Sequence, residues 1–92
     1  MKVLQSRHFL KVVKKLHANQ KADLDKAVRA LIQDPLMGER KSGDLGGIRV
    51  HKFKMTNQLH LLAYTYEHDA LTLTLLALVS HENFYRDLEQ SL

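Results

Sequence analysis

The chain has 92 residues, no cysteine, 45% hydrophobic residues and a formal net charge of +4. This length predicts one small ordered domain over residues 1–92 and argues against a deep, enclosed active site. The lack of cysteine argues against a disulfide framework and a thiolate metal site. The sequence shows neither a signal-peptide pattern nor a run of ~20 apolar residues, so the cytoplasm is the expected location and no membrane contact is expected.

Positive charge is concentrated in the first two-thirds of the chain. Residues 1–34 carry eight Lys or Arg against three Asp, residues 35–56 carry five against two acids, and residues 57–92 carry one Arg against five acids. A basic surface attracts polyanions and acidic partners by sequence-independent electrostatics. The distribution therefore favours a nucleic acid or an acidic protein segment as partner, although a charge of +4 also serves ordinary solubility.

The first half of the chain predicts a strand followed by two helices. Residues 2–5 alternate in polarity and form a short first strand. Apolar residues then recur at helical spacing after Ser6, a suitable N-cap, and again after Asn19, a second N-cap candidate. Pro35 ends the second helix at or before Asp34. A tight connection between the helices predicts an antiparallel hairpin.

The second half predicts an antiparallel meander. Residues 35–47 contain the proline and all four glycines and form a loop, with a short strand near residues 39–41. Beyond the loop the period changes from 3.6 to 2, which predicts strands over residues 48–54, 59–66 and 71–80 with tight turns between them. A short terminal helix is expected after residue 80.

Alternation along the last strand predicts its environment. One continuous apolar face is expected from Leu71, Leu73, Leu75, Ala77 and Val79. Because Leu76 and Leu78 complete the opposite face, the strand should lie centrally and be covered on both sides for half its length. The predicted fold class is α+β, with a helix hairpin on one face of a twisted, mainly antiparallel sheet.

A basic, β-prone segment over residues 46–54 holds the first candidate site. Because side chains alternate in a strand, Arg49 and His51 share one face, whereas Lys52 and Lys54 share the other. Four cationic or titratable side chains this close together indicate a surface that faces phosphate. The alternative is a basic edge strand whose lysines keep other chains from pairing with it.

Histidines from neighbouring sheet elements extend this site. His51, His60 and His81 belong to three adjacent elements, and we expect the face away from the helices to carry Arg49 and His51, with His81 at its rim. Such a set suits RNA cleavage through the 2′-hydroxyl, in which imidazoles transfer protons and a cation holds the phosphate. Zinc is the competing use, but no pair of histidines has a dedicated ligand spacing, so no metal or other cofactor is expected.

Three short motifs stand in this β-α-α-β-β-β order. They are Ser-Gly-Asp-Leu-Gly-Gly-Ile-Arg-Val-His before one strand, Leu-Leu-Ala-Tyr within the next, and Ser-His-Glu-Asn-Phe-Tyr after the last. The combination resembles the RelE/ParE toxins of bacterial toxin–antitoxin systems over nearly the whole chain. The Gly-x-Arg-x-His segment and the terminal His-x-x-x-aromatic element are most similar to the YafQ-like ribonuclease branch.

The resemblance implies roles for individual residues. Arg49 and His51 stand where RelE-type toxins have cationic residues facing the scissile phosphate, and His81 stands at the general acid/base position. Tyr85 stands where the family has an aromatic residue that stacks on or assists at the reacting nucleotide. Further candidates for contacts to RNA or phosphate are Lys52, Lys54, His60, Arg40 and Lys41.

The function implied is a toxin that arrests growth by cleaving mRNA at the ribosome, as a metal-independent endoribonuclease. The alternative is a ParE-type DNA gyrase inhibitor that acts by binding without catalysis. Two departures favour this alternative. The segment Gln58–Leu61 offers only His60 where many ribonuclease members have an Arg, and Glu82 places a negative charge beside His81. A third hypothesis is a non-enzymatic basic scaffold.

Each hypothesis implies a cognate antitoxin as partner, with operator DNA reached only through that antitoxin. An acidic or amphipathic antitoxin segment would meet basic groups on the first helix and on the short strand, although solvation is the simpler account of the helix charges. These groups are Lys11, Lys14, Lys15, Arg40 and Lys41.

Overall fold

The computed structural model describes residues 1–41 and 47–81 of the chain. The elements follow in the order β1 (Lys2–Gln5), α1 (Arg7–Lys14), α2 (Ala18–Gln33), β2 (Glu39–Arg40), β3 (Arg49–Met55), β4 (Gln58–Glu67) and β5 (Thr72–Ser80). The element order and fold class predicted from the sequence are confirmed. The terminal helix expected after residue 80 lies outside the described residues.

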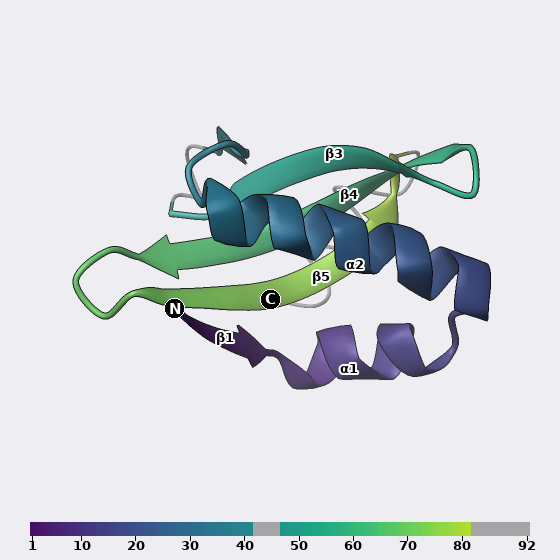
Figure 1. Cartoon of the computed structure of the whole chain (residues 1–92), viewed down its shortest axis with the longest axis horizontal. Helices are drawn as coiled ribbons and strands as arrows, with labels where there is room; N and C mark the ends of the chain where they lie inside the picture. Colours follow the sequence, from purple (N-terminus) through teal and green to yellow (C-terminus); the bar gives the residue numbers. More distant parts are fainter. Residues whose placement is uncertain (42–46, 82–92) are drawn as a thin grey trace.

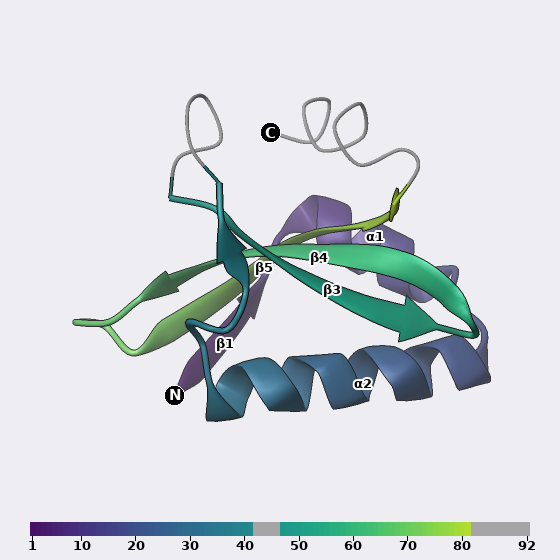
Figure 2. The same cartoon turned by 90° about the horizontal axis from the view of Figure 1, so that it is seen from above.

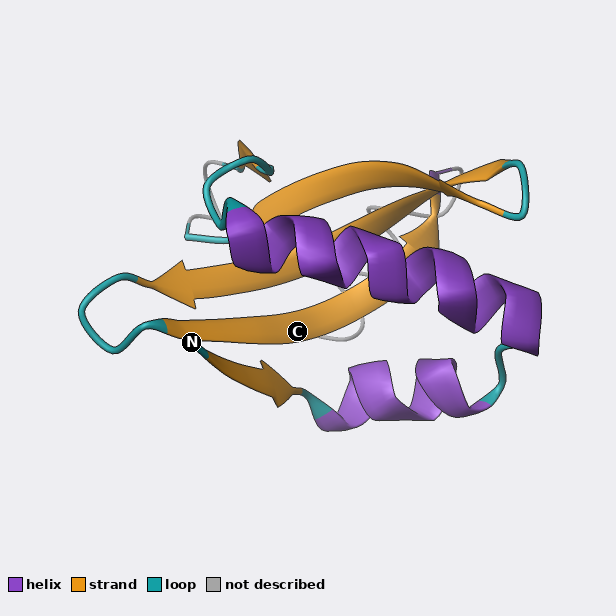
Figure 3. Cartoon of the chain, in the orientation of Figure 1, coloured by secondary structure: helices purple, strands orange, loops and turns teal. Residues whose placement is uncertain are grey.

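The strands form one sheet in the order β1-β5-β4-β3-β2. β1 runs parallel to β5, whereas the other neighbours are antiparallel. Figures 1 and 3 show α2 in front of this twisted sheet and α1 below it, following β1, and Figure 2 shows α2 lying along one face of the sheet. None of the described helices is long and apolar enough to span a membrane.

Ser6 connects the start of α1 to the sheet. Its Oγ accepts a hydrogen bond from the backbone N–H of Phe9 at 3.0 Å and donates one to the carbonyl of Leu76 at 2.7 Å. The first bond caps the helix as the sequence predicts. The second fixes the direction in which α1 leaves β1, so that Phe9 is buried against the sheet.

α2 begins one residue earlier than its predicted cap. The N-cap is His17, whose backbone N–H donates to the side-chain oxygen of Gln20 at 2.8 Å. Asn19 lies inside the first turn, so the expectation that it caps the helix is wrong. The helix ends at Gln33, immediately before the residue that precedes Pro35, as the sequence predicts.

Two apolar clusters lie on opposite faces of the sheet. The helix-side core contains Phe9, Leu24, Leu31, Met55, Leu62, Tyr64, Leu73, Leu75 and Leu78. The cluster on the other face contains Ile48, Val50, Leu61, Ala63, Ala77 and Val79. β5 contributes to both clusters and lies between β1 and β4, which confirms its predicted central position.

A β-bulge divides β5 into two halves. Ala63 pairs with Ala77, but the next residue of β4, Tyr64, pairs with Leu75, so Leu76 is the extra residue. The bulge reverses the alternation of side chains. Leu75 therefore faces the helices whereas Ala77 faces the other side. The predicted continuous apolar face along β5 is wrong for this reason.

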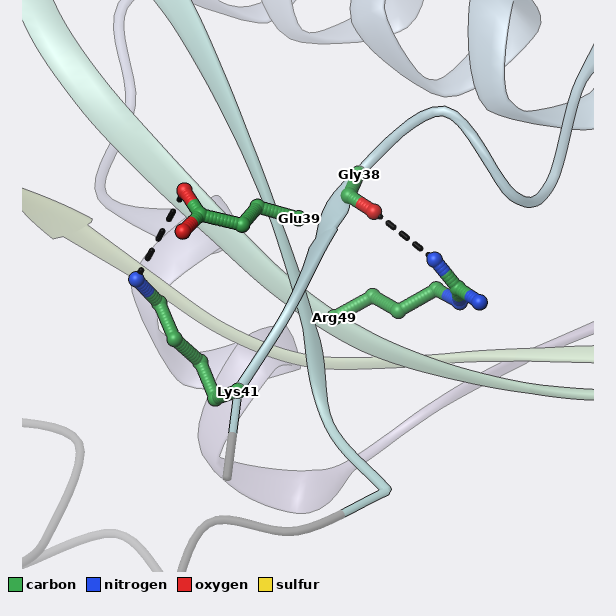
Figure 4. Close-up of polar contacts among 4 residues, drawn as sticks. All are labelled: Gly38, Glu39, Lys41 and Arg49. Atoms are coloured by element: carbon green, nitrogen blue, oxygen red, sulfur yellow. Dashed lines mark hydrogen bonds and ion pairs between the residues drawn. The ribbon is translucent and has the colours of Figure 1, made fainter.

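The loop after α2 is held by two side chains of the sheet. The buried hydroxyl of Tyr64 donates to the carbonyl of Pro35 at 2.7 Å and accepts from the N–H of Gly38 at 2.9 Å. The Arg49 guanidinium donates to the carbonyl of Leu36 at 3.1 Å. It also donates to the carbonyl of Gly38 at 2.9 Å (Figure 4). A Cβ atom on Gly38 would lie 2.5 Å from the Tyr64 oxygen. These contacts fix the path of the chain into β2.

Substitution Tyr64→Phe should lower the free energy of unfolding by about 1–3 kcal/mol, because it leaves the buried partners on Pro35 and Gly38 without their hydrogen bonds. Urea unfolding of the purified protein measures this difference. Tyr66→Phe is the matched control, because Tyr66 is half-buried and packs against the core through its ring. Equal losses in the two variants would contradict the proposed role of the Tyr64 hydroxyl.

Candidate functional site

The register of β3 on β4 decides which face each candidate residue occupies. Arg49 pairs with Tyr64 and His51 pairs with Leu62, and both partners belong to the helix-side core. Residues directly opposite in an antiparallel pair project from the same face. Arg49 and His51 therefore lie on the helix side. The prediction that the face away from the helices carries them is wrong.

The contacts of Arg49 give this residue a structural role. Arg49 is half-buried, and its guanidinium donates to the carbonyl of Leu36 and to that of Gly38, the second of which is drawn in Figure 4. It also lies near the Tyr64 hydroxyl, whose pKa is raised mainly by burial. The side chain thus holds the loop after α2 and is not directed at the opposite face, where the lysines of β3 lie.

His51 belongs to a row of rings on the helix side. Its imidazole stacks on Phe53 with ring centroids 5.9 Å apart and an interplanar angle of 5°, and the Phe53 ring lies 6.5 Å from that of His60. Desolvation by burial lowers the pKa of His51. The neutral imidazole is therefore favoured near neutral pH, and the residue provides no fixed positive charge for a phosphate.

Lys52 and Lys54 occupy the face away from the helices. They pair with Leu61 and Leu59, respectively, and Leu61 belongs to the apolar cluster of that face. Both lysines are exposed. The predicted separation of these lysines from Arg49 and His51 is confirmed. Two flexible ammonium groups beside an apolar surface can reach a phosphate and leave space for a base.

His81 directly follows β5, whose last residue, Ser80, pairs with His60. The register ends at that pair. His81 lines one recess with Leu59, whose partner on β3 is Lys54. An exposed imidazole is a suitable group for proton transfer at a bound phosphate.

This recess lies at one end of the sheet. It has a volume of about 330 Å³ and is lined by Gln58, Leu59, Ser80 and His81. The His81 side chain is exposed there.

The remaining candidates are distributed more widely. His60 faces the helix side with His51, and its Nδ1 lies 3.0 Å from the carbonyl of Gln58. Arg40 is exposed on β2, and Lys41 forms an ion pair with Glu39 at 3.8 Å (Figure 4). Tyr85 lies outside the described residues. Within residues 1–41 and 47–81, no group of histidines and carboxylates could hold a metal ion.

The structure therefore unites only part of the predicted site. It brings Lys52 and Lys54 to one face and places Arg49 and His51 on the other, and His81 lines a recess with Leu59, the partner of Lys54. The recess beside His81 was not predicted, because it depends on how far β4 extends beyond the end of β5. In the sequence, only the hairpin turn between β3 and β4 indicates that Leu59 pairs with Lys54, because that turn sets the register.

Comparison with known proteins identifies the family. A model of the ParE-like toxins of type II bacterial toxin–antitoxin systems matches residues 3–89. The chain belongs to this family. No curated protein matches its sequence. The predicted RelE/ParE superfamily is thereby confirmed, whereas membership of the YafQ-like branch stays a prediction.

Solved structures show the same fold at low sequence identity. A double mutant of the E. coli toxin RelE in the free state matches with a TM-score of 0.74 and 12% identity, over 98% of this chain and 90% of RelE. The intact E. coli RelBE toxin–antitoxin complex matches with 0.70 and 14%, over 86% and 94%. A conserved hypothetical protein from Helicobacter pylori matches with 0.56 and 19%, over 91% and 98%.

The lowered pKa of His51 predicts a loss of stability in mild acid. The unfolded chain binds the proton with an ordinary pKa of about 6.5, whereas the folded chain binds it more weakly, so stability is full above that pH and falls as the pH drops below it. Unfolding free energies at pH 7.5 and pH 5 should therefore differ less in His51→Gln than in the wild type. An identical pH dependence of both proteins would contradict the effect of burial on His51.

Proposed function

We propose that this toxin inhibits translation by cutting mRNA, with His81 as a proton-transferring group and with Lys52 and Lys54 as phosphate ligands. The single observation that carries the proposal is the recess that His81 lines together with Leu59, whose partner on β3 is Lys54. All three side chains are exposed.

The chemistry matches this set of groups. Attack of a ribose 2′-hydroxyl on the adjacent phosphate needs a base for the hydroxyl proton, an acid for the leaving 5′ oxygen and a cation for the added negative charge. His81 supplies an imidazole, a group that can act as either acid or base. Lys52 and Lys54 supply the positive charge. We keep Tyr85, four residues after His81, as the residue that stacks on the base.

His51 and Arg49 take different roles in this proposal. His51 lies on the helix side and stacks on Phe53, whereas His81 lines a recess with Leu59, so we do not assign the two histidines as an acid–base pair across one phosphate. Arg49 acts as a positioning residue through the loop after α2. The second proton-transferring group in this proposal is therefore not His51.

The partners are proposed from the relatives. The E. coli toxin RelE, which shares the fold, occurs in a toxin–antitoxin complex with RelB. We propose that this chain likewise binds a cognate antitoxin and is held inactive by it, and that its target is mRNA on the ribosome. The similarity to the YafQ-like ribonucleases rests on the short motif that contains Arg49 and His51 and on the motif that begins at Ser80.

A second candidate function is binding to DNA gyrase without catalysis. The observation that favours it is the engagement of Arg49 by the loop carbonyls, together with the position of His51 on the helix side. Neither residue lies on the face that carries Lys52 and Lys54. That face therefore holds fewer catalytic groups than the sequence motifs imply.

The His81→Ala variant should lose codon-phased cleavage of a translated reporter mRNA by about 10²- to 10⁴-fold, since a missing general acid or base costs roughly that factor. Primer extension after induction measures the cuts, and a supercoiling assay with purified gyrase runs alongside. His68→Ala is the matched control, because His68 lies in the β4–β5 loop at the far end of the sheet.

Three outcomes separate the two functions. Cuts that vanish with His81→Ala and persist with His68→Ala support the ribonuclease. Growth arrest that survives His81→Ala, with intact mRNA and inhibited supercoiling, supports the gyrase inhibitor and contradicts the ribonuclease. Cuts of equal strength in both variants would contradict a catalytic role of His81.

A further inference from the structure

One residue at the end of β1 binds two successive carbonyls of β5. The backbone N–H of Ser6 donates to the carbonyl of Leu75 at 2.9 Å, and the Ser6 hydroxyl donates to the carbonyl of Leu76 at 2.7 Å. In a regular strand, successive carbonyls point to opposite sides. Both carbonyls reach Ser6 here because Leu76 is the extra residue of the bulge. Ser6 therefore binds a backbone geometry that only the bulged strand presents.

The sequence of β5 allows a second pairing with β4, one without the bulge. In such a regular register, Leu76 would stand opposite Ala63, and every later residue of β5 would pair one position closer to the start of β4. Leu62 would then stand opposite Ala77 in place of its observed partner, Leu78. The observed pairing is the bulged register.

The apolar pattern of β5 does not select one of these two registers. In the bulged register the helix side receives Leu75 and Leu78, and the other face receives Ala77 and Val79. In the regular register Ala77 and Val79 would join Leu75 on the helix side, and Leu78 would change to the other face. Both registers thus place apolar side chains on both faces, so other contacts must decide between them. The hydrogen bond from the Ser6 hydroxyl is such a contact, because it requires the bulge.

The register also determines the recess that contains His81. In the bulged register the pairing of β5 with β4 ends at Ser80 and His60, and the recess is lined by Gln58, Leu59, Ser80 and His81. The regular register would pair Ser80 with Leu59 and His81 with Gln58. A hydrogen-bonded ladder would then join the residues that line the recess. The bulge therefore keeps this space open and leaves His81 outside the ladder.

We propose that Ser6 is a positioning residue that holds β5 in the bulged register and thereby holds His81 at the recess. Ser6 lies between β1 and α1, beside β5 (Figure 1), and His81 directly follows the last residue of β5. The Ser6 hydroxyl acts through the bulge and makes no contact with substrate. Its effect on RNA cleavage rests on the proposed function, whereas its effect on the register does not.

The same hydroxyl also caps α1, so two substitutions are needed to separate its roles. The Ser6 oxygen accepts from the N–H of Phe9 at 3.0 Å, while its hydrogen is donated to Leu76. An ionised aspartate accepts a hydrogen bond at an N-cap as serine does, but it has no hydrogen to donate. Ser6→Asp therefore keeps the cap and removes the bond to the bulge. Ser6→Thr keeps both, because threonine has a hydroxyl.

The first measurement determines the register by NMR in the full chain, labelled with ¹³C and ¹⁵N. In the wild type and in Ser6→Thr, cross-strand NOEs should join Leu62 to Leu78. In Ser6→Asp, NOEs from Leu62 to Ala77 should appear, because the lost hydrogen bond shifts the equilibrium between the registers by about tenfold. Thr72→Val is the matched control, since it removes an exposed hydroxyl–carbonyl bond at the start of β5 and should keep the wild-type NOEs.

Deletion of Leu76 supplies the second measurement. Without this residue, Leu75 and Ala77 become neighbours in a regular strand, and both keep their observed partners on β4. The deletion variant thus has the pairing of the bulged register without a bulge to hold. Cleavage of a translated reporter mRNA should fall about tenfold in Ser6→Asp relative to Ser6→Thr. This difference should disappear in the deletion background, whereas a residue that acted only through α1 would show it in both backgrounds.

Three results would overturn the proposal. These are unchanged NOEs of Leu62 in Ser6→Asp, a loss of cleavage in Ser6→Asp that persists after deletion of Leu76, and an equal loss in Ser6→Thr, which retains the donor. The NOEs decide the proposal alone where the deletion variant does not fold. Absence of mRNA cleavage in every variant, the wild type included, would refute the proposed ribonuclease, and the NOEs would still decide the role of Ser6.

Discussion

The hydrogen-bonded ladder between β3 and β4 is the constraint on which the rest of the site depends. It pairs Arg49 with Tyr64 at one end and Met55 with Gln58 at the other, where a two-residue turn of Thr56 and Asn57 with positive φ fixes the register. A slip of one residue would exchange the two faces of β3. The turn therefore determines which cations lie beside the helices and which remain exposed on the opposite face.

The elements of the fold could be predicted from local signals, whereas the two halves of β5 could not. Ser6 and Pro35 marked helix boundaries correctly, and the change of period placed the strands to within about two residues. The bulge at Leu76 left no trace in the sequence, because leucines occupy both faces of β5 near it. In a regular strand Leu75 and Ala77 would share a face, and the alternation of apolar residues along β5 does not indicate that they face opposite sides.

The composition of the site was easier to predict than its orientation. Alternation separated Arg49 and His51 from Lys52 and Lys54 correctly. It did not show which pair faces the helices, because apolar residues follow on both sides, with Val50 on one and Phe53 on the other. Only the pairing with β4 decides the face. When a strand is covered on both sides over part of its length, its two faces differ too little in polarity for the sequence to show which one lies against the helices.

The parallel pairing of β1 with β5 has a consequence for the synthesis of the protein. Lys2 pairs with Thr72 and Gln5 with Leu75, so β1 can complete its pairing only after β5 has been synthesised. The same holds for the hydrogen bond that Ser6, the N-cap of α1, donates to the carbonyl of Leu76. Pairing between segments this far apart in the sequence requires the closure of a long loop and is intrinsically slow. The edge of the sheet at β1 therefore depends on synthesis of the chain as far as β5.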